Sequence, residues 1–257
     1  MKRKRLNLQL YVKIEQMEHL LFIAAEKEEL DCAKAAWDGL SDLPADGGQA
    51  TSGRKIKVDF LLTGIGTTVT AYKLTKAILE AQAQDQPYTL IVEIGVAGSY
   101  DLEKFPVRSA AVISAEHFSD LGFETSDGIK TLFDYGCIRA NDFPYEDRAL
   151  KRQSLPQKHV EAYLQTLEAG VGVTVQTVTG NPQKLAENRG KFGADIESME
   201  GAAVYYVALM EQGPFVEIRT VSNAVGVSDS SKWDNAGARA TLLECCRNLL
   251  NALAQDL

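Results

Sequence analysis

Short apolar runs alternate with longer amphipathic stretches along most of this chain, and that alternation limits the fold more than any other feature. The apolar run at residues 20–25 predicts a buried strand, and the spacing of residues 28–40 predicts a helix. The same order recurs over residues 55–62 and 67–83. Strands that alternate with helices predict a mostly parallel α/β sheet with helices on both of its faces.

The pattern continues to the C-terminus, with a long irregular stretch over residues 117–151 that carries several aromatic side chains. Such a stretch is typical of loops around a site. Residues 41–54, rich in Gly, Asp and Ser, predict a loop. The remaining expected strands cover residues 88–94, 108–114, 171–178 and 215–221, and the expected helices cover residues 157–168, a short piece after Pro182, 199–210 and 236–253.

The composition predicts one cytoplasmic domain. The chain has 257 residues, 45% of them hydrophobic, and α/β folds of this length often form a single domain. We expect that domain over residues 19–257, with residues 1–18 as an N-terminal extension. Apolar runs fall short of the roughly 18–20 residues that cross a bilayer, so no membrane partner is expected. A net charge of −8 discourages nonspecific binding of nucleic acid.

The cysteines and histidines favour neither a disulfide framework nor a metal site. The four cysteines lack a paired CxxC spacing, which favours buried, reduced thiols. The three histidines are scattered, with no HExxH motif. We therefore expect neither a metal ion nor a cofactor. The residues concerned are Cys32, Cys137, Cys245, Cys246, His19, His117 and His159.

Residues 195–203 place carboxylates and small residues at the opening of an apolar helix. Acids at a helix start, such as Glu29 and Glu200, could serve only to complement the helix dipole. Asn223, which follows an apolar run, could be a turn residue bonded to its own backbone. Glycines after strands, at 64–66 and 95–98, could bring backbone amides close to a phosphate or sugar, or could simply form turns.

Taken together, these residues indicate a particular kind of site more specifically than each does alone. Glu29, the pair Met199-Glu200 and the segment from Arg219 to Ser222-Asn223 resemble the active-site set of the purine nucleoside phosphorylase and nucleosidase superfamily. The resemblance extends from about residue 20 to the C-terminus. It implies a three-layer α/β fold with a central mixed, largely parallel sheet. It also implies a homodimer that takes a small-molecule purine nucleoside.

The resemblance assigns a role to each matching residue. In the nucleosidases the last Glu of an acidic cluster after the first strand activates water, which places Glu29 in that role. The family uses the Met that matches Met199 against the ribose, and the Glu that matches Glu200 to bind the ribose hydroxyls. The remaining residues expected to bind substrate are Val96, Ala97, Gly98, Arg219 and Ser222.

Asn223 departs from the family pattern, which has Asp at this position. The Asp can share a proton with purine N7, whereas an amide is no comparable acid but can donate hydrogen bonds. Asn223 therefore favours a 6-oxopurine leaving base over adenine. Together with Asp120-Leu121-Gly122 and with Val225-Gly226 before Trp233, it resembles the futalosine hydrolase branch, whose members release hypoxanthine from a carboxyphenyl-bearing nucleoside during menaquinone synthesis.

Alternatives stay open at this point. The chain could be a 5'-methylthioadenosine/S-adenosylhomocysteine nucleosidase, a true phosphorylase that uses phosphate, or a catalytically silent nucleoside-binding module. Residues 180–183 replace an aromatic loop that contacts the base in the methylthioadenosine enzymes, so base contacts there do not transfer to this chain. Four aromatic residues are candidate apolar walls of the site: Phe118, Phe123, Phe143 and Trp233.

Overall fold

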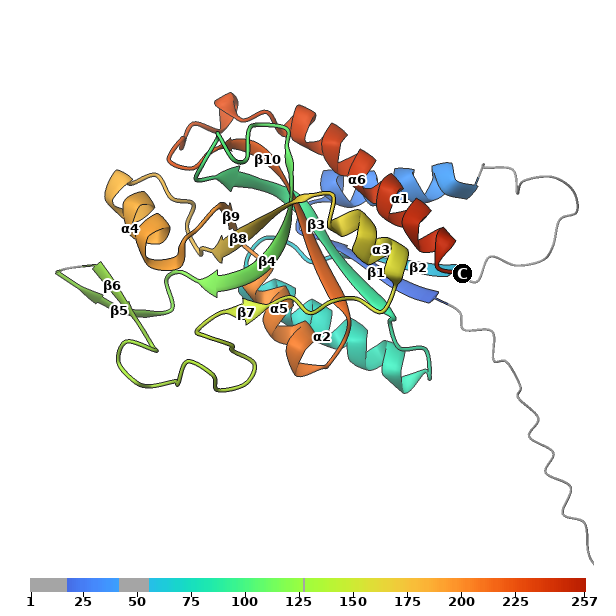
Figure 1. Ribbon diagram of the computed structural model, residues 1–257, viewed down its shortest axis with the longest axis horizontal. Helices are drawn as coiled ribbons and strands as arrows, with labels where there is room; N and C mark the ends of the chain where they lie inside the picture. The colour runs from blue at the N-terminus through green and yellow to red at the C-terminus, as the bar shows by residue number, and fades with distance from the viewer. Residues whose placement is uncertain (1–17, 42–55, 127) are drawn as a thin grey trace, which may run out of the picture.

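The computed structural model describes residues 18–41, 56–126 and 128–257. The expected extension, apart from Glu18, and the loop at residues 42–54 lie outside the described residues. The described part forms a mixed β-sheet with helices on both faces (Figure 1). The expected α/β architecture is therefore confirmed.

Eight strands of the described chain form the main sheet, in the order β10-β4-β8-β9-β3-β1-β2, with β7 beside β4. A separate hairpin joins β5 and β6. The strands are β1 Glu18–Ala24, β2 Ile56–Leu62, β3 Leu90–Ser99, β4 Ala110–Phe118, β5 Gly122–Thr125, β6 Gly128–Thr131, β7 Leu150–Lys151, β8 Glu168–Thr174, β9 Ile196–Ser198 and β10 Phe215–Ala224.

The sheet is mixed, and part of it closes on itself. Strand β3 pairs with β9 on one side and with β10 on the other, so β3, β10, β4, β8 and β9 form a closed ring. Strands β2, β1, β3 and β10 run parallel, whereas β4 runs antiparallel to β10 and β9 antiparallel to β3. Only residues 100–109 join β3 to β4, too few for the crossover that a parallel arrangement needs. The parallel order therefore describes only part of the sheet.

The helices pack against the two faces in separate groups. Helices α1, α3 and α6 share one hydrophobic core with alternate residues of β1, such as Leu20 and Phe22. Helices α2 and α5 share the other core with the intervening residues Leu21 and Ile23. Burial on both faces explains why this strand reads as a continuous apolar run. The helices are α1 Lys27–Ser41, α2 Thr67–Ala83, α3 Lys158–Leu164, α4 Pro182–Phe192, α5 Gly201–Met210 and α6 Asn235–Gln255.

Two strands extend beyond their expected ends. The glycine segment 95–98 lies inside β3 and not in a turn after it, because Gly98 pairs with both Glu197 of β9 and Asn223 of β10. Asn223 likewise lies inside β10, at a register irregularity. Between residues 117 and 151, the irregular stretch contains the end of β4, the β5–β6 hairpin and β7.

The expectation of buried cysteines holds for part of the set. Cys245 and Cys246 are buried in α6, whereas Cys32 is half-buried and Cys137 is exposed in a turn. All four are free thiols. Among the described residues, no helix has the length and apolar character to span a membrane. The same residues contain no group of three or more His, Cys, Asp or Glu placed to hold a metal ion.

Candidate active site

A cavity of about 140 Å³ opens where the C-terminal ends of β1, β3 and β10 meet the starts of α1 and α5. Ligands of open α/β sheets bind at this edge. The structure brings eight of the nine expected site residues to its wall, and Arg219 lies buried close behind them. The eight are Glu29, Val96, Ala97, Gly98, Met199, Glu200, Ser222 and Asn223.

Glu29 connects the first turn of α1 to β3. One carboxylate oxygen accepts a hydrogen bond from the backbone N–H of Glu26 at 3.0 Å, which satisfies a free donor at the helix start. The other accepts from the N–H of Val96 at 2.8 Å. Burial raises the pKa of Glu29, while the Val96 bond and the charge of Arg219 oppose that rise. The residue thus caps its helix and also faces the cavity, with a pKa above that of an ordinary carboxyl group.

Glu200 stands at the N-cap of α5 but makes no side-chain capping bond to that helix. Its Oε1 accepts from the backbone N–H of Gly66 at 3.0 Å, and its Oε2 lies 3.7 Å from Nη1 of Arg219. Gly66 has a φ of 100°, a conformation that favours glycine. The helix-dipole interpretation therefore does not account for where this side chain bonds. Its contacts hold it at the cavity wall.

The amide of Asn223 is oriented by its neighbours. The hydroxyl of Ser222 donates to Asn223 Oδ1 at 2.7 Å, and Asn223 Nδ2 donates to the carbonyl of Ala224 at 2.9 Å. An amide nitrogen has two N–H groups, so one remains for a ligand. The bond to neighbouring backbone matches one open interpretation, although the residue lies in a strand and not in a turn.

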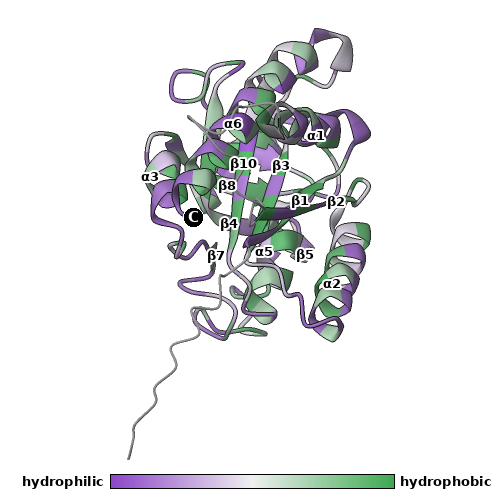
Figure 2. Cartoon of the chain, turned by 90° about the vertical axis from the view of Figure 1, so that its right-hand side faces the viewer, coloured by the Kyte–Doolittle hydropathy of each residue, from purple (hydrophilic) through white to green (hydrophobic). Residues whose placement is uncertain are grey.

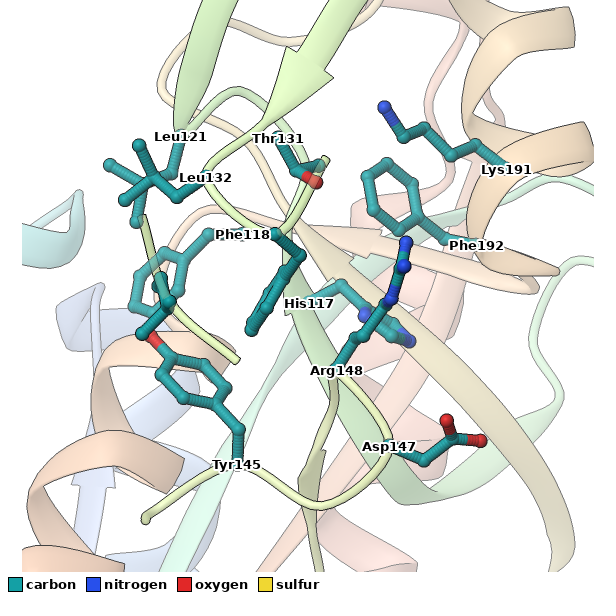
Figure 3. Close-up of a pocket in the computed structure, with 12 residues that line it drawn as sticks. His117, Phe118, Leu121, Thr131, Leu132, Tyr145, Asp147, Arg148, Lys191 and Phe192 are labelled. Carbon is teal, nitrogen blue, oxygen red and sulfur yellow. The ribbon is translucent and has the colours of Figure 1, made fainter. Parts of the chain in front are cut away.

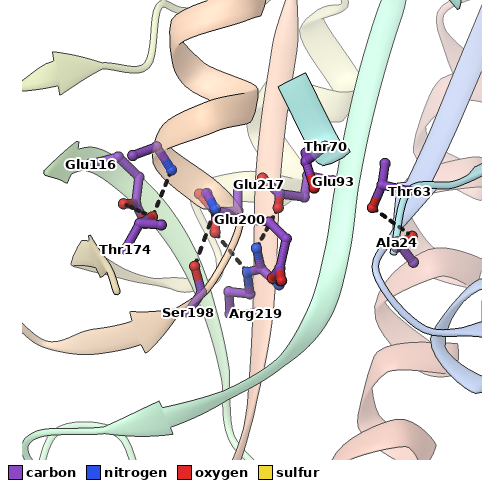
Figure 4. A network of polar contacts seen from close by, with 12 residues as sticks. Ala24, Thr63, Thr70, Glu93, Glu116, Thr174, Ser198, Glu200, Glu217 and Arg219 are labelled. Carbon is purple, nitrogen blue, oxygen red and sulfur yellow. Dashed lines mark hydrogen bonds and ion pairs between the residues drawn. The ribbon is translucent and has the colours of Figure 1, made fainter. Parts of the chain in front are cut away.

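Arg219 is 1% exposed and lies among carboxylates (Figure 4). Its Nε donates to Glu217 at 2.6 Å and its Nη2 donates to Glu93. The described contacts include no hydrogen bond between Arg219 and Glu29; the guanidinium contacts Glu200 instead. An added Cβ at Gly95 would collide with this guanidinium, so glycine there makes room for it.

The structure places the four aromatic candidates in different environments. Trp233 lines the cavity, and its indole N–H donates to the carbonyl of Val227 at 2.7 Å. Phe118 lines a different cavity, while Phe123 and Phe143 are exposed.

The sequence did not single out Glu197, which also lines the site. Its carboxylate accepts from the N–H of Thr179 at 2.9 Å and from the hydroxyl of Tyr100 at 2.5 Å. Its place in the acidic segment 195–200 was the available signal.

A second cavity, of about 360 Å³, lies between residues 117–148 and the end of α4 (Figure 3). Figure 3 shows the rings of Phe118, Tyr145 and Phe192 around it, with Arg148 above His117. The two cavities share no lining residue. The irregular stretch therefore encloses a separate hollow and contributes no described wall to the candidate active site.

Comparison with known proteins agrees with this geometry. The model of the phosphorylase superfamily matches residues 48–254, and the chain belongs to that superfamily. It is 31% identical to a futalosine hydrolase of Streptomyces coelicolor over 196 residues, which cover 76% of this chain and 79% of that protein.

Solved structures of the superfamily share the fold. A 5'-methylthioadenosine/S-adenosylhomocysteine nucleosidase from Colwellia psychrerythraea 34H, in complex with adenine, is 21% identical with a TM-score of 0.68, covering 93% of this chain and 96% of its own. A mutant futalosine hydrolase of Helicobacter pylori is 14% identical with a TM-score of 0.66, covering 93% and 100%. The expected nucleoside phosphorylase-like fold is confirmed.

Proposed function

We propose that this chain hydrolyses the N-glycosidic bond of futalosine and releases hypoxanthine in menaquinone biosynthesis, in the cytoplasm and within one domain over residues 19–257. The observation that carries the proposal is one cavity that holds two buried carboxylates, Glu29 and Glu200, beside the amide of Asn223. The similarity to a futalosine hydrolase over most of both chains supports the choice of substrate.

In the proposed mechanism the two carboxylates act on different parts of the nucleoside. Glu200 accepts hydrogen bonds from the ribose hydroxyls, and its contact with Arg219 supports its negative charge. As the base departs, the sugar gains oxocarbenium character and the base gains negative charge. Glu29 takes a proton from the water that attacks C1'. Its two backbone N–H bonds hold the carboxylate in place for that step.

Asn223 is proposed to stabilise the departing base. Its remaining amide N–H is a donor, and hypoxanthine presents acceptors at N7 and at the 6-oxo group. Adenine has the same N7 acceptor but carries a 6-amino group, which cannot accept a hydrogen bond, so the two bases differ at position 6. The geometry therefore favours a 6-oxopurine over the adenine of a methylthioadenosine substrate. Val96, Ala97, Gly98, Met199 and Ser222 complete the proposed wall around the sugar and base.

Water is favoured over phosphate as the nucleophile. Among the residues that the structure describes, those that line the cavity include no Lys, Arg or His, the usual partners of a phosphate. The cation behind the cavity wall, Arg219, is already bonded to Glu93 and Glu217. The N–H of Val96 is likewise bonded to Glu29 and not free for an anion.

We also propose a homodimer, with the outer side of α2 in the interface. Large apolar side chains are exposed on and just before this helix, with Tyr72 at 69% and Ile65 at 57%. Apolar patches of this kind mark association surfaces. Because Ile65 also lines the candidate active site, a second copy seated on α2 would lie next to the substrate.

Base release from chosen nucleosides tests the proposal. The full chain is incubated with futalosine, with inosine and with methylthioadenosine, each with and without phosphate, and free base is separated by chromatography. We expect hypoxanthine from futalosine at a rate independent of phosphate. Faster release of adenine from methylthioadenosine would favour the nucleosidase alternative. Ribose 1-phosphate would indicate a phosphorylase, and binding without base release a silent module.

A further inference from the structure

Three fully buried carboxylates lie inside the ring of strands, behind the candidate active site. Glu93 of β3, Glu116 of β4 and Glu217 of β10 are at most 2% exposed. Glu93 and Glu217 stand opposite each other in the β3–β10 pairing, so their side chains lie on the same side of the sheet. Figure 2 shows hydrophilic stretches among apolar strands at the centre of the sheet, where β10 and β3 lie. Burying unpaired charge costs a great deal, so such a cluster calls for a specific reason.

Glu93 and Glu217 hold one guanidinium between them. Arg219 lies two residues after Glu217, on the same side of β10, and donates to Glu217 through Nε and to Glu93 through Nη2 (Figure 4). Each carboxylate therefore binds a different nitrogen of the planar group. Two anchors on two strands fix its position and its plane, which a single contact would leave free to turn.

The third nitrogen of that guanidinium, Nη1, lies near both carboxylates of the proposed active site. Nη1 lies 3.7 Å from Oε2 of Glu200. It occupies the space that a side chain at Gly95 would take, and Glu29 Oε1 lies only 3.2 Å from that same point. Arg219 thus lies close behind Glu29 and Glu200 and separates them from Glu93 and Glu217.

We propose that Glu93 and Glu217 are positioning residues that anchor Arg219 and, with their own negative charges, set the electrostatic potential at Glu29. This inference rests on the proposed function, because it assigns the water-activating step to Glu29. The charged groups that act directly on Glu29 are Arg219 from β10, Glu200 from the start of α5 and Glu93 from β3, with the thiol of Cys32 on its own helix. Glu217 acts on Arg219 and Glu200, and through them on Glu29.

Glu116 provides a matched comparison, because it is equally buried but holds no cation. Its Oε2 accepts from the hydroxyl of Thr174 at 2.9 Å, and its Oε1 has no partner. It approaches Glu217 at Gly201, where an added Cβ would lie 2.6 Å from the Glu116 carboxylate and 2.7 Å from that of Glu217. Burial raises the pKa of Glu116 well above the usual carboxyl value. Burial raises the pKa of Glu93 and Glu217 as well, but those two carboxylates are bonded to Arg219. We therefore assign the surplus proton of the cluster to Glu116, which holds no cation.

The test compares Glu93→Gln, Glu217→Gln and Glu116→Gln through the pH dependence of kcat/KM. Amides keep the shape and one acceptor, so Arg219 stays bonded. Glu93→Gln removes a negative charge that acts on Glu29, and Glu217→Gln removes one that acts on Arg219 and Glu200, the two charged neighbours of Glu29. Fewer like charges lower the pKa of Glu29, so the acid limb moves to lower pH, by about one pH unit. Because Glu116 is assigned as neutral, Glu116→Gln leaves the limb in place.

The substrate is whichever nucleoside the wild-type chain cleaves fastest, and thermal unfolding checks that each variant is folded. If the wild type releases no base at all, the proposed function fails. If it is active and either Glu93→Gln or Glu217→Gln leaves the acid limb unmoved, the positioning proposal fails. An equal shift in Glu116→Gln also contradicts it, since loss of packing would then explain the effect. If both amide variants unfold, Arg219→Lys is used instead. It keeps the positive charge but loses the planar guanidinium, and it must still raise KM or shift the acid limb of the pH profile.

Discussion

Replacing Asn223 by Asp exchanges a hydrogen-bond donor for an acceptor at the position proposed to contact the leaving base. In the native site Nδ2 donates to the Ala224 carbonyl at 2.9 Å, while Oδ1 accepts from Ser222 at 2.7 Å. The Asn223→Asp variant keeps the bond from Ser222. In place of the bond to Ala224, it puts a carboxylate oxygen next to the carbonyl oxygen, so two acceptors face each other. The introduced carboxyl is also buried, since Asn223 is 7% exposed.

The magnitude follows from these contacts. A buried carbonyl that loses its donor costs about 1–3 kcal/mol, and this cost falls on the ionised form of the introduced carboxyl. Its pKa therefore rises above the usual value of about 3.9, yet it stays largely ionised at pH 7.5. Losing a donor to the 6-oxo group or N7 costs a similar amount. Because 1.4 kcal/mol is a factor of ten, hypoxanthine release at pH 7.5 should fall about 10- to 100-fold.

The assay follows hypoxanthine and adenine release from pH 5 to pH 8. At low pH the introduced carboxyl gains a proton and becomes a donor again, so the ratio of variant to wild-type rate rises. Taking that ratio removes the pH effects that the two proteins have in common. Asn223→Ala is the matched control, since it loses the donor without gaining a titratable group, and its ratio should stay flat. A wild type that prefers methylthioadenosine, or an Asn223→Asp variant with unchanged base preference, would refute the reasoning.

Three further predictions test other parts of the structure. Glu29→Gln should lower the rate by a factor on the order of 10²–10⁴ in a folded protein, because an amide cannot take the proton from water; a normal rate in steady-state assays removes Glu29 from this role. Glu116→Gln should gain stability relative to wild type as pH rises, by up to about 1.4 kcal/mol per pH unit. The folded carboxyl has the higher pKa, so the native state binds the extra proton and wild-type stability declines above the unfolded pKa. Urea unfolding at pH 4.5 and pH 7.5 measures the difference in stability between Glu116→Gln and wild type. An equal difference at the two pH values contradicts this prediction. Tyr72→Glu should shift a dimer toward monomer in sedimentation, whereas an unchanged mass argues against α2 as the interface.

Much of the fold could be predicted because its signals are local. The helix α2 occupies the expected residues, and β1 and β2 agree with the expected strands to within two residues. The convergence of Glu29 and Asn223 was also accessible, since each follows or ends a strand whose C-terminal end lies at one edge of the parallel part of the sheet. The three-residue strand β9 was not, because Ile196–Ser198 is too short to show a period.

The anchoring of Arg219 was beyond sequence reasoning for a different reason. Glu93 and Glu217 are 124 positions apart, and only the register of β3 against β10 makes them neighbours. Alone, each reads as a polar interruption in an apolar strand. The antiparallel entry of β4 could be anticipated from its short connection, but the ring closure that buries Glu116 depends on pairings between distant strands.

The positions where simple sequence rules fail lie directly behind the candidate site. Buried strands should be apolar, yet β3 and β10 carry Glu93, Glu217 and Arg219 at their centre. Gly95 gives up side-chain packing inside β3 so that the guanidinium can lie across it. Apolar side chains in this ring of strands would cost less free energy to bury, since replacing buried ion pairs by apolar residues is often stabilising. The cluster therefore finds its explanation in the charge that it presents to Glu29 at the cavity wall, and not in fold stability.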